Sequence, residues 1–542
     1  MVDVLLIQPP IRDFYLTAKR TLPYGLAAIA GAVMEHGFSV EILDGLATSK
    51  SRPIALPEPM SCLKRYYGRS DRSPFSLFHQ YRHFGYSFEH LARMAREKAP
   101  LLIGISSLFS AYSQEALHTA AVVKAACPQS AIVLGGHHPT IFPEAVLADG
   151  AVDYVLRGEG EVSLPALIHC LKTGQDLDAI PGIAFYRKSG ELVLKPPASM
   201  DELDAFPPPA LDLVSHRYYR RENGAGAVVT ASRGCPMRCS YCSLGDSSIY
   251  PYRRRNLESV LAEIDTWVKR FGAGFIDFED ENISMDRRWF KALLKALTDR
   301  YGTRGPELRA MNGLYPPSLD QEMIQAMAGA GFKTLNLALA TTAPDQLARF
   351  QRPDVREAFE RALCHAGRCG LGAVGYLIAG APGQSAADSL EDLLYLAGQR
   401  VLAGVSVFYP APGSANYRRL ERSGHLPGDF SLMRSSALPI GDTTSRLEAV
   451  TLLRLGRILN FMKSLMDEGR PMPRSASLPA DWDSASARDR REVGIRLLQA
   501  FLDDGKILGI TACGAVYEHE ASSELVTGFL NGIKSIQLVG CR

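Results

Sequence analysis

The sequence has no long apolar run and no excess of charge of either sign. No apolar stretch approaches the roughly 20 residues that cross a bilayer. The opening MVDVLLIQPP has no basic segment ahead of its short apolar run. The 60 basic residues nearly cancel the 58 acidic ones, so no global field would collect a polyanion. We therefore expect a cytoplasmic protein that binds neither nucleic acid nor a membrane.

Cysteine is also scarce, with 10 in 542 residues. Most are scattered, which is typical of buried free thiols in a reducing compartment rather than of a disulfide framework. The exception is GCPMRCSYC, where Cys235, Cys239 and Cys242 follow one another with C-x3-C-x2-C spacing. This triplet is the strongest chemical signal in the chain.

Residues 1–165 alternate short apolar strands with helical segments, which predicts an α/β fold with a doubly wound, Rossmann-like parallel sheet. Ligands bind such sheets outside the carboxyl ends of the strands. No G-x-G-x-x-G follows the first strand, where IQPPIRDFY stands instead. This argues against a nicotinamide cofactor, because prolines replace the glycines that approach the pyrophosphate.

The rest of the chain divides into three further segments. Residues 166–222 contain three consecutive prolines and are expected to form a linker. Residues 223–430 contain six apolar strands with helices between them, which predicts a partial (β/α)6 barrel with its chemistry at the carboxyl strand ends. Residues 431–542 are expected to form a mainly helical region.

Two kinds of metal site are compatible with three clustered thiols. Structural zinc sites use four ligands, and here only one C-x2-C pair is present, with no histidine nearby. Three thiolates can instead hold three irons of a 4Fe-4S cluster and leave the fourth iron open to an exogenous chelator. We favour the cluster and keep structural zinc as the alternative.

GCPMRCSYC, with Tyr241 before the third thiol, resembles the signature of the radical S-adenosylmethionine (SAM) superfamily. The resemblance implies that Cys235, Cys239 and Cys242 ligate the cluster and are the catalytic residues. It also implies that SAM chelates the open iron and is cleaved to a 5′-deoxyadenosyl radical. An electron donor such as flavodoxin or ferredoxin would then be a partner.

Other segments resemble the same superfamily. FEDENIS matches its acidic strand end, which implies contacts of Glu279, Asp280 and Glu281 with SAM or substrate; a solvated acidic turn is the alternative. LIAGAPG matches its Gly-x-Pro-Gly segment near the adenine, at Gly380, Pro382 and Gly383, unless it is an ordinary turn. The basic run at residues 253–255 would stabilise negative charge on cluster or substrate, or simply begin an exposed helix.

The chain departs from the superfamily at the fourth strand. Relatives usually have Ile-Glu-Ser there, whereas this chain has Leu339, Ala340 and Thr341. A carboxylate expected to contact SAM is therefore missing. Either Glu281 or Asp345 replaces it, or SAM is held in a different way.

Three segments of the first domain, GISSLFSAYSQEAL, VLGGHHPTIFPEAVL and DYVLRGEGE, resemble the cobalamin-binding domain of cobalamin-dependent radical SAM proteins. The Asp-x-His-x-x-Gly motif that supplies a histidine to cobalt is absent. The resemblance therefore implies a cobalt without that ligand, whose lower face meets the loop at residues 108–112. The implied cobalamin-binding residues are Ser106, Ser107, Leu108, Phe109, Tyr112, Gly135, Gly136, His138, Gly158 and Glu159.

Two of these residues have more specific expectations. His138 is expected to contact a corrin amide or the nucleotide tail, with a folding role for His137 and His138 as the alternative. Glu159 is expected to accept hydrogen bonds from the backbone or the ligand.

Cobalamin and a radical generator in one chain imply a methyltransferase. It would transfer a methyl group from methylcobalamin, through the 5′-deoxyadenosyl radical, to an unactivated carbon or a phosphinate phosphorus of a small-molecule biosynthetic intermediate. The SSLF and RRR segments are most similar to C-methyltransferases of fosfomycin biosynthesis. A cobalamin-containing oxidative cyclase or ring-rearranging enzyme is the first alternative, and a cobalamin sensor with a vestigial cluster is the second.

Overall fold

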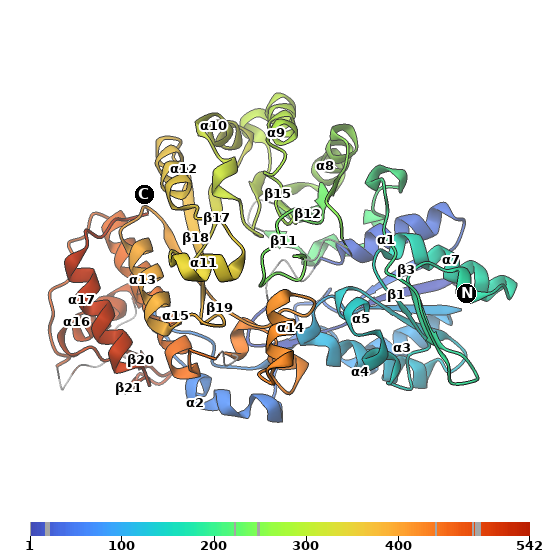
Figure 1. Ribbon diagram of the computed structural model, residues 1–542, viewed down its shortest axis with the longest axis horizontal. Helices are drawn as coiled ribbons and strands as arrows, with labels where there is room; N and C mark the ends of the chain where they lie inside the picture. The colour runs from blue at the N-terminus through green and yellow to red at the C-terminus, as the bar shows by residue number, and fades with distance from the viewer. Residues whose placement is uncertain are drawn as a thin grey trace.

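The computed structural model describes residues 2–16, 22–221, 224–245, 250–438, 442–479, 482 and 489–541. The chain folds into an N-terminal domain, a central set of strands with helices outside them, and a helical C-terminal region (Figure 1). No helix within the described ranges is long and apolar enough to cross a membrane.

The first domain is built on a seven-stranded sheet with the order β10-β9-β8-β7-β6-β1-β3. Along β1 the side chains alternate between two buried clusters, with Val4 and Leu6 on one face and Leu5 and Ile7 on the other, as the period of a strand requires. The doubly wound parallel sheet is thereby confirmed. Its five parallel strands are β1 (Val4–Gln8), β3 (Val40–Asp44), β6 (Leu102–Ser106), β7 (Ala131–Gly135) and β8 (Tyr154–Leu156).

Helices cover both faces of this sheet. α1 (Tyr24–Glu35) and α7 (Gly160–Thr173) pack into the cluster of Val4. α3 (Phe88–Lys98) and α4 (Ser113–Ala126) pack into the cluster of Leu5. Because both faces are covered, the strands are apolar along nearly their whole length.

The segment expected to be a linker, residues 166–222, contributes to the first domain. The end of α7 occupies its start, and β9 (Ile183–Tyr186) and β10 (Leu192–Leu194) extend the sheet with antiparallel pairing. Strands of three or four residues carry too little periodicity to be recognised in a sequence. Only the later part of the segment, which includes the prolines at 207–209, connects the two domains.

The central part contains the six expected strands in the expected order, as two sets of three parallel strands. Among the described residues, only isolated bridges link the two sets, Leu308 with Phe332 and Leu314 with Leu337. A continuous barrel sheet is therefore not confirmed. The strands are β12 (Gly224–Val229), β15 (Ala273–Phe278) and β16 (Glu307–Arg309), with β11 (Arg220–Arg221) on the edge, and β17 (Thr334–Ala340), β18 (Gly372–Ala379) and β19 (Leu402–Val407).

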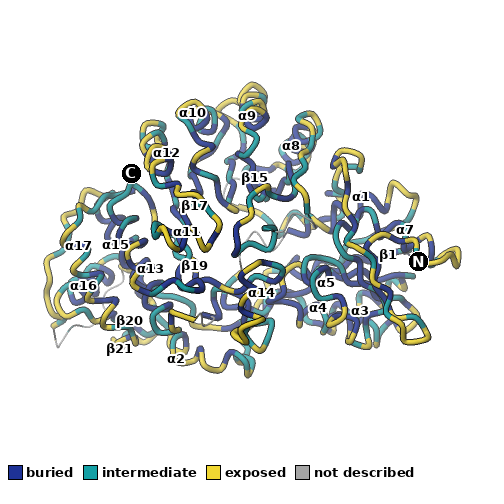
Figure 2. The backbone as a smooth tube through the Cα atoms, viewed as in Figure 1, coloured by how far each residue is buried: buried dark blue, intermediate teal, exposed yellow. Residues whose placement is uncertain are grey.

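Helices line the outside of these strands, with buried inner faces and exposed outer faces (Figure 2). The first of them begins where the side chain of Asn256 accepts a hydrogen bond from the amide of Ser259, and ends at Gly272 with a φ of +64°. The outer helices are α8 (Leu257–Phe271), α9 (Arg287–Tyr301), α10 (Gln321–Ala330), α12 (Arg356–Arg368) and α13 (Ala386–Ala397). α11 (Pro344–Phe350) and α14 (Ala415–Arg422) lie at the carboxyl ends of the strands, where Phe350 and Leu420 share a buried cluster with Ala340.

The C-terminal region is mainly helical, as expected, with α15 (Arg446–Asp467), α16 (Arg490–Asp504) and α17 (Ser523–Ser535). It also contains an unexpected hairpin of β20 (Leu508–Ile510) and β21 (Val516–Glu518).

An insertion of the first domain lies between β3 and α3 and reaches the C-terminal region. It contains β4 (Ser51–Pro53), a 3-10 helix (Glu58–Leu63), α2 (Lys64–Tyr67) and β5 (Arg82–Phe84), and β5 pairs with both β4 and β2 (Ile11–Asp13). The amide of Arg72 donates to the carbonyl of Ile510 at 2.8 Å. The insertion and the C-terminal region are thus packed together, whereas the two termini lie on opposite sides of the molecule (Figure 1).

Candidate active site

The cysteine loop follows β12 through β13 (Ser232–Arg233), which pairs with β14 (Arg253–Arg254). Gly234 starts the loop with a φ of +77°, and a Cβ there would lie 2.4 Å from the carbonyl oxygen of Tyr250. Glycine is therefore required at this turn. Further on, Ser240 donates its amide to the carbonyl of Phe350 at 3.0 Å and its hydroxyl to that of Arg349 at 2.8 Å. These bonds fix the loop against α11.

The three thiols of this loop are free and lie close enough to influence one another. Burial raises the pKa of Cys242 to about 11, and the neighbouring thiolates of Cys239 and Cys235 raise it as well. A bound cation would reverse this effect and deprotonate the thiols.

No three His, Cys, Asp or Glu side chains in the described ranges converge on a point that would suit a single metal ion. An iron-sulfur cubane does not need such convergence, because each thiolate binds a different iron. The three free thiols on one short loop fit the donor set of a 4Fe-4S cluster.

Arg352 is a residue that the sequence analysis missed. Its Nη1 lies 3.7 Å from the sulfur of Cys239 and 3.0 Å from the hydroxyl of Tyr241, and its Nη2 donates to the carbonyl of Ala338 at 3.0 Å. Tyr241 also packs against Phe350, with ring centroids 4.8 Å apart. A positive charge thus lies beside the thiols, on a segment 110 residues or more away in sequence.

The acidic residues after β15 have different surroundings. Asp280 accepts hydrogen bonds from the amide of Ala231 at 3.1 Å and the hydroxyl of Ser232 at 2.5 Å. These contacts fix the approach to the cysteine loop, although burial raises the pKa of Asp280 to about 6. Glu279 lies beside Asn312, whose amide donates to the backbone carbonyl of Glu279 at 2.8 Å.

Glu281 is the acid whose surroundings suit a ligand contact best. Its Oε2 is buried and has no hydrogen-bond partner. Burial raises the pKa of this carboxyl to about 7. An unpartnered buried carboxylate oxygen costs free energy unless a ligand supplies a donor.

The end of β17 lacks the expected carboxylate, and its backbone is unusual as well. Ala340 has a φ of +69°, and the pairing with β18 shifts register between Ala338 and Ala340. Asp345, one of the two acids considered as replacements, is exposed in the first turn of α11. Buried Asp392 of α13 instead accepts hydrogen bonds from the amide and hydroxyl of Thr342, at 2.6 and 2.7 Å.

The Gly-x-Pro-Gly segment forms the turn after β18. Gly380 and Gly383 have φ values of +71° and +79°. A Cβ on Gly380 would lie 3.2 Å from the side chain of Thr444, and one on Gly383 would lie 3.1 Å from Arg349. The turn that contains Pro382 is thus packed closely on both sides, which explains its glycines.

In the first domain, the predicted residues at the ends of β6 and β7 lie together. The amide of Ser107, next to Ser106, donates to the carbonyl of Gly135 at 2.8 Å. Gly136 has a φ of +117°, and a Cβ there would lie 2.6 Å from the carbonyl oxygen of Ser107. The hydroxyl of Ser107 is buried without a hydrogen-bond partner.

Next to Ser107, the loop after β6 has two large apolar side chains at the surface: Leu108 is 55% exposed and Phe109 is 42% exposed. Tyr112, at the end of the same loop, is buried and donates its hydroxyl to the carboxylate of Asp13. The orphaned hydroxyl, the backbone approach that only glycine permits and the exposed apolar pair fit a cobalamin held at this edge of the sheet.

His138 is the second residue of the neighbouring short helix α5 (His137–Ile141), which is followed by α6 (Pro143–Leu147). Its Nδ1 lies 2.9 Å from the hydroxyl of Ser110, and its ring packs against Phe430 with centroids 4.9 Å apart. Burial lowers the pKa of His138 to about 4, so the ring is neutral. These contacts match the folding role that was the alternative for this residue.

Glu159 joins the first domain to the cysteine loop. It accepts a hydrogen bond from the amide of Met200, as expected, and forms ion pairs with Arg233 at 3.1 Å and Arg253 at 2.7 Å. Gly158 before it has no room for a Cβ, which would lie 2.1 Å from the carbonyl oxygen of Ala198.

All three arginines of the basic run are paired with carboxylates of the protein. Arg253 pairs with Glu159, Arg254 with Asp286, and Arg255 with Glu263 at 2.5 Å. The run therefore ties the segment after the cysteine loop to the rest of the fold.

Comparisons with known proteins agree with this geometry. Residues 78–168 match the B12 binding domain model, and residues 229–396 match the Radical SAM superfamily model. The chain is 25% identical over 475 residues to cytidylyl-2-hydroxyethylphosphonate methyltransferase of Streptomyces wedmorensis, covering 80% of this chain and 84% of that protein. It is 30% identical over 207 residues to an anaerobic magnesium-protoporphyrin IX monomethyl ester cyclase of Rubrivivax gelatinosus, covering 37% of each.

A similar fold occurs in the radical SAM methyltransferase TsrM of Kitasatospora setae, in a structure with cobalamin and a 4Fe-4S cluster bound. The TM-score is 0.58 at 18% identity, over 78% of this chain and 75% of that one. The cofactors of the present protein are cobalamin, a 4Fe-4S cluster and SAM. Ser107, Leu108, Phe109 and Gly136 together form what we call the cobalamin cradle, at the edge of the first sheet. From the two family models, the cysteine loop and this cradle, we conclude that the chain belongs to the cobalamin-dependent radical SAM enzymes.

Proposed function

We propose that the protein is a methyltransferase that acts on an unactivated carbon, or a phosphinate phosphorus, of a small biosynthetic intermediate. The bound cofactors would supply reductive cleavage of SAM and carriage of the methyl group. The electrons would come from a flavodoxin or ferredoxin. The match to the methyltransferase of Streptomyces wedmorensis supports the proposal, because it covers most of both chains.

The observation that carries the proposal is the direct connection between the two cofactor regions. Arg233 lies two positions before Cys235, and it forms ion pairs with Glu159 at 3.1 Å and Glu161 at 2.5 Å. His137 adds a second link, with its Nε2 3.3 Å from the carbonyl of Pro412. A methyl carrier and a radical source serve one substrate only if they are held at a fixed separation.

The residues of this chain would perform the work of positioning. The thiolates of the cysteine loop would hold the cluster, and Arg352 would balance negative charge beside Cys239. Glu281 would accept a hydrogen bond from SAM or the substrate. Ser107, Gly136 and the exposed Leu108 and Phe109 would seat the corrin and exclude water from one of its faces.

The test is an anaerobic reconstitution with iron, sulfide, cobalamin and SAM, followed by mass spectrometry on candidate intermediates. We expect 5′-deoxyadenosine, S-adenosylhomocysteine and a product in which a methyl group has replaced one hydrogen, so that it is heavier by CH2. SAM labelled with deuterium on its methyl group should pass the label to the product. 5′-Deoxyadenosine formed with a product that has lost hydrogens would contradict methyl transfer and support the oxidative cyclase alternative; the partly matching relative is named a cyclase.

The same reconstitution tests the sensor alternative. A reduced holoprotein that cleaves no SAM in the presence of an electron donor and candidate substrates would contradict an enzymatic role. The electron donor is tested separately, by replacing a flavodoxin or ferredoxin system with dithionite.

A further inference from the structure

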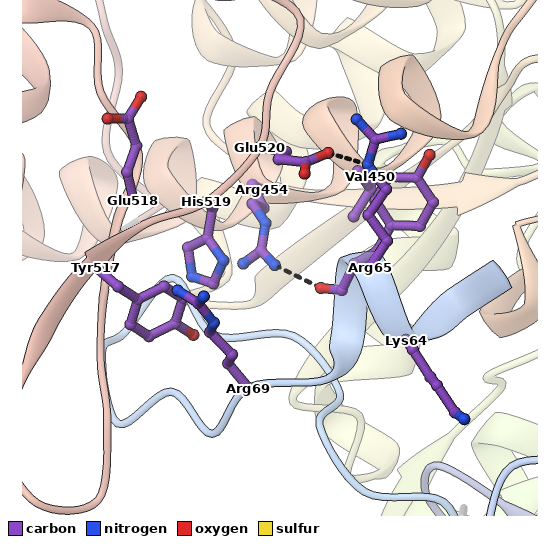
Figure 3. Close-up of a pocket in the computed structure, with 10 residues that line it drawn as sticks. Lys64, Arg65, Arg69, Val450, Arg454, Tyr517, Glu518, His519 and Glu520 are labelled. Carbon is purple, nitrogen blue, oxygen red and sulfur yellow. Dashed lines mark hydrogen bonds and ion pairs between the residues drawn. The ribbon is translucent and has the colours of Figure 1, made fainter. Parts of the chain in front are cut away.

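A cavity lies between the insertion of the first domain and the C-terminal region, away from the cysteine loop. Its volume is about 320 Å³. Figure 3 shows that its walls come from α2 and the residues after it, from α15, and from the segment at β21. None of its residues belongs to the cysteine loop or to the cobalamin cradle. The lining residues are Lys64, Arg65, Tyr66, Arg69, Val450, Arg454, Tyr517, Glu518, His519 and Glu520.

Arg454 is the unusual residue of this cavity. It is only 2% exposed, and its Nη2 donates to the carbonyl of Tyr66 at 3.3 Å. Its Nε and Nη1 are buried and have no hydrogen-bond partner. A buried guanidinium without an anion is costly, because desolvation is not repaid by pairing. The fold therefore holds a cationic fork ready for an oxyanion.

The nearby acid Asp71 is already occupied by other donors. It accepts hydrogen bonds from the amides of Ser73 at 2.8 Å and Ile510 at 3.1 Å, and its other oxygen lies 2.9 Å from Nε2 of His519. Asp71 thus orients His519 at the cavity wall, and its carboxylate forms no ion pair with Arg454.

The remaining walls provide a second cation and an aromatic surface. The guanidinium of Arg69 lies 5.2 Å from the ring centroid of Tyr517. Arg65 is neutralised by an ion pair with Glu520. In Figure 3 the side chains of Glu518 and Lys64 point away from Arg454. The centre of the cavity therefore has Arg454 and Arg69 as its cations, and the nearest acid, Asp71, acts on Arg454 only through its charge, because its oxygens are bound by other donors.

We propose that this cavity binds the phosphate group of a phosphorylated small molecule, with Arg454 and Arg69 as anion ligands and Tyr517 against the organic part. Two guanidinium groups suit a phosphate, which has more charge and more acceptor oxygens than a carboxylate. The volume is in the range of small-molecule pockets, about 300 Å³ and above. The inference does not depend on methyl transfer, since the cavity shares no residue with the reaction centre.

Calorimetric titration of the anaerobic holoprotein tests this inference, with glycerol 3-phosphate, inorganic phosphate and glycerol at constant ionic strength in chloride. We expect one site for each phosphate and none for glycerol. Arg454→Met and Arg454→Lys should weaken binding at least about tenfold, because a charged hydrogen-bonding fork is lost. Arg69→Gln should weaken it by roughly threefold or more. The matched control, Arg361→Gln on the exposed face of α12, should leave it unchanged.

Absence of phosphate binding would overturn the inference, as would affinity that survives both Arg69→Gln and Arg454→Lys. If Arg454→Met fails to fold, the other two variants decide the result, because one retains the buried charge and the other changes an exposed residue. Binding of inorganic phosphate with exclusion of glycerol 3-phosphate would overturn the assignment to a phosphate ester. SAM cleavage measured in the same preparations separates this result from the fate of the reaction centre.

Discussion

The carboxyl ends of the two parallel regions are built in different ways. In the first sheet, the strand ends are shaped by glycines, which allow close contact between backbone segments. A Cβ on Gly136 or Gly158 would lie only 2.6 or 2.1 Å from a backbone oxygen. At the ends of the central strands, polar side chains determine the structure of the site. Asp280 fixes the entry to the cysteine loop, and Arg352 contacts the sulfur of Cys239. One cofactor region is therefore defined by local backbone, and the other by contacts between distant segments.

The cysteine loop should give the strongest response to substitution. Replacing Cys235, Cys239 and Cys242 together with Ala should abolish the iron-sulfur absorbance and all SAM cleavage, because no thiolate remains to hold the cluster. Cobalamin binding should persist, as it depends on the other region. The control replaces Cys364 and Cys369, and it should retain the cluster. An intact cluster in the triple variant would refute the assignment.

The second-largest effect should come from a change at Gly136, where the backbone of the first sheet is tightly packed. Gly136→Val places a β-branched side chain at a φ of +117°, 2.6 Å from a carbonyl oxygen, with a strain of at least about 2 kcal/mol. We expect most of the bound cobalamin to be lost while the cluster is retained, as measured by absorption spectra and metal analysis. Gly150→Val, where nothing lies within 4 Å of a Cβ, is the control. Unchanged corrin content in Gly136→Val would contradict the placement of cobalamin beside Gly136.

The connection between the two regions can be broken at Glu159. Glu159→Gln leaves Arg233 and Arg253 without their shared carboxylate, and loss of a buried ionic partner costs about 3 kcal/mol. We expect a lower melting temperature and a drop in coupled methyl transfer that exceeds the drop in SAM cleavage. The exposed pair of Arg187 and Glu191 offers a control, since Glu191→Gln should change stability by less than about 0.5 kcal/mol. Equal effects of the two substitutions would contradict the connection.

The weakest response should come from a buried acid of the first domain. Burial raises the pKa of Glu115 on α4 from 4.5 to about 7, so the folded state binds this proton more tightly than the unfolded state. The contribution to stability is complete below pH 4.5 and disappears as the pH rises through about 7. Between pH 5 and 7 the free energy of unfolding should fall by about 2 kcal/mol from this group. Urea titrations should show a flatter pH profile for Glu115→Gln, and an unchanged profile would contradict this.

Local features of the chain allowed much of the fold to be predicted. The alternation of apolar strands and helices predicts the doubly wound sheet and the six central strands, because each element has a hydrophobic pattern that depends only on neighbouring residues. The cysteine triplet is recognisable for the same reason. Gly136 and Gly158 follow strand ends that closely approach another backbone and leave no room for a side chain, whereas a Cβ on Gly135 would make only an ordinary contact, 3.7 Å from the carbonyl oxygen of Leu156.

Contacts between distant segments could not be predicted. Arg352 is one of many arginines until the fold brings it to Cys239, 113 residues away. The role of Asp280 in fixing Ser232, and the burial of His138 against Phe430, depend on packing that no local pattern records. The strands at 183–194 were missed because they are short. The packing of the insertion against the C-terminal hairpin was missed because the contacting residues are far apart in sequence, 448 positions for Asp71 and His519.

The pairing of Asp71 with His519 spans 448 positions. On the ribosome, the insertion cannot form this contact until 448 further residues have been synthesised, and closing so large a loop has an entropic cost. The arginine-lined cavity is therefore complete only after the segment at β21 has folded against the insertion, whereas α15 can pack on α2 before that segment is made.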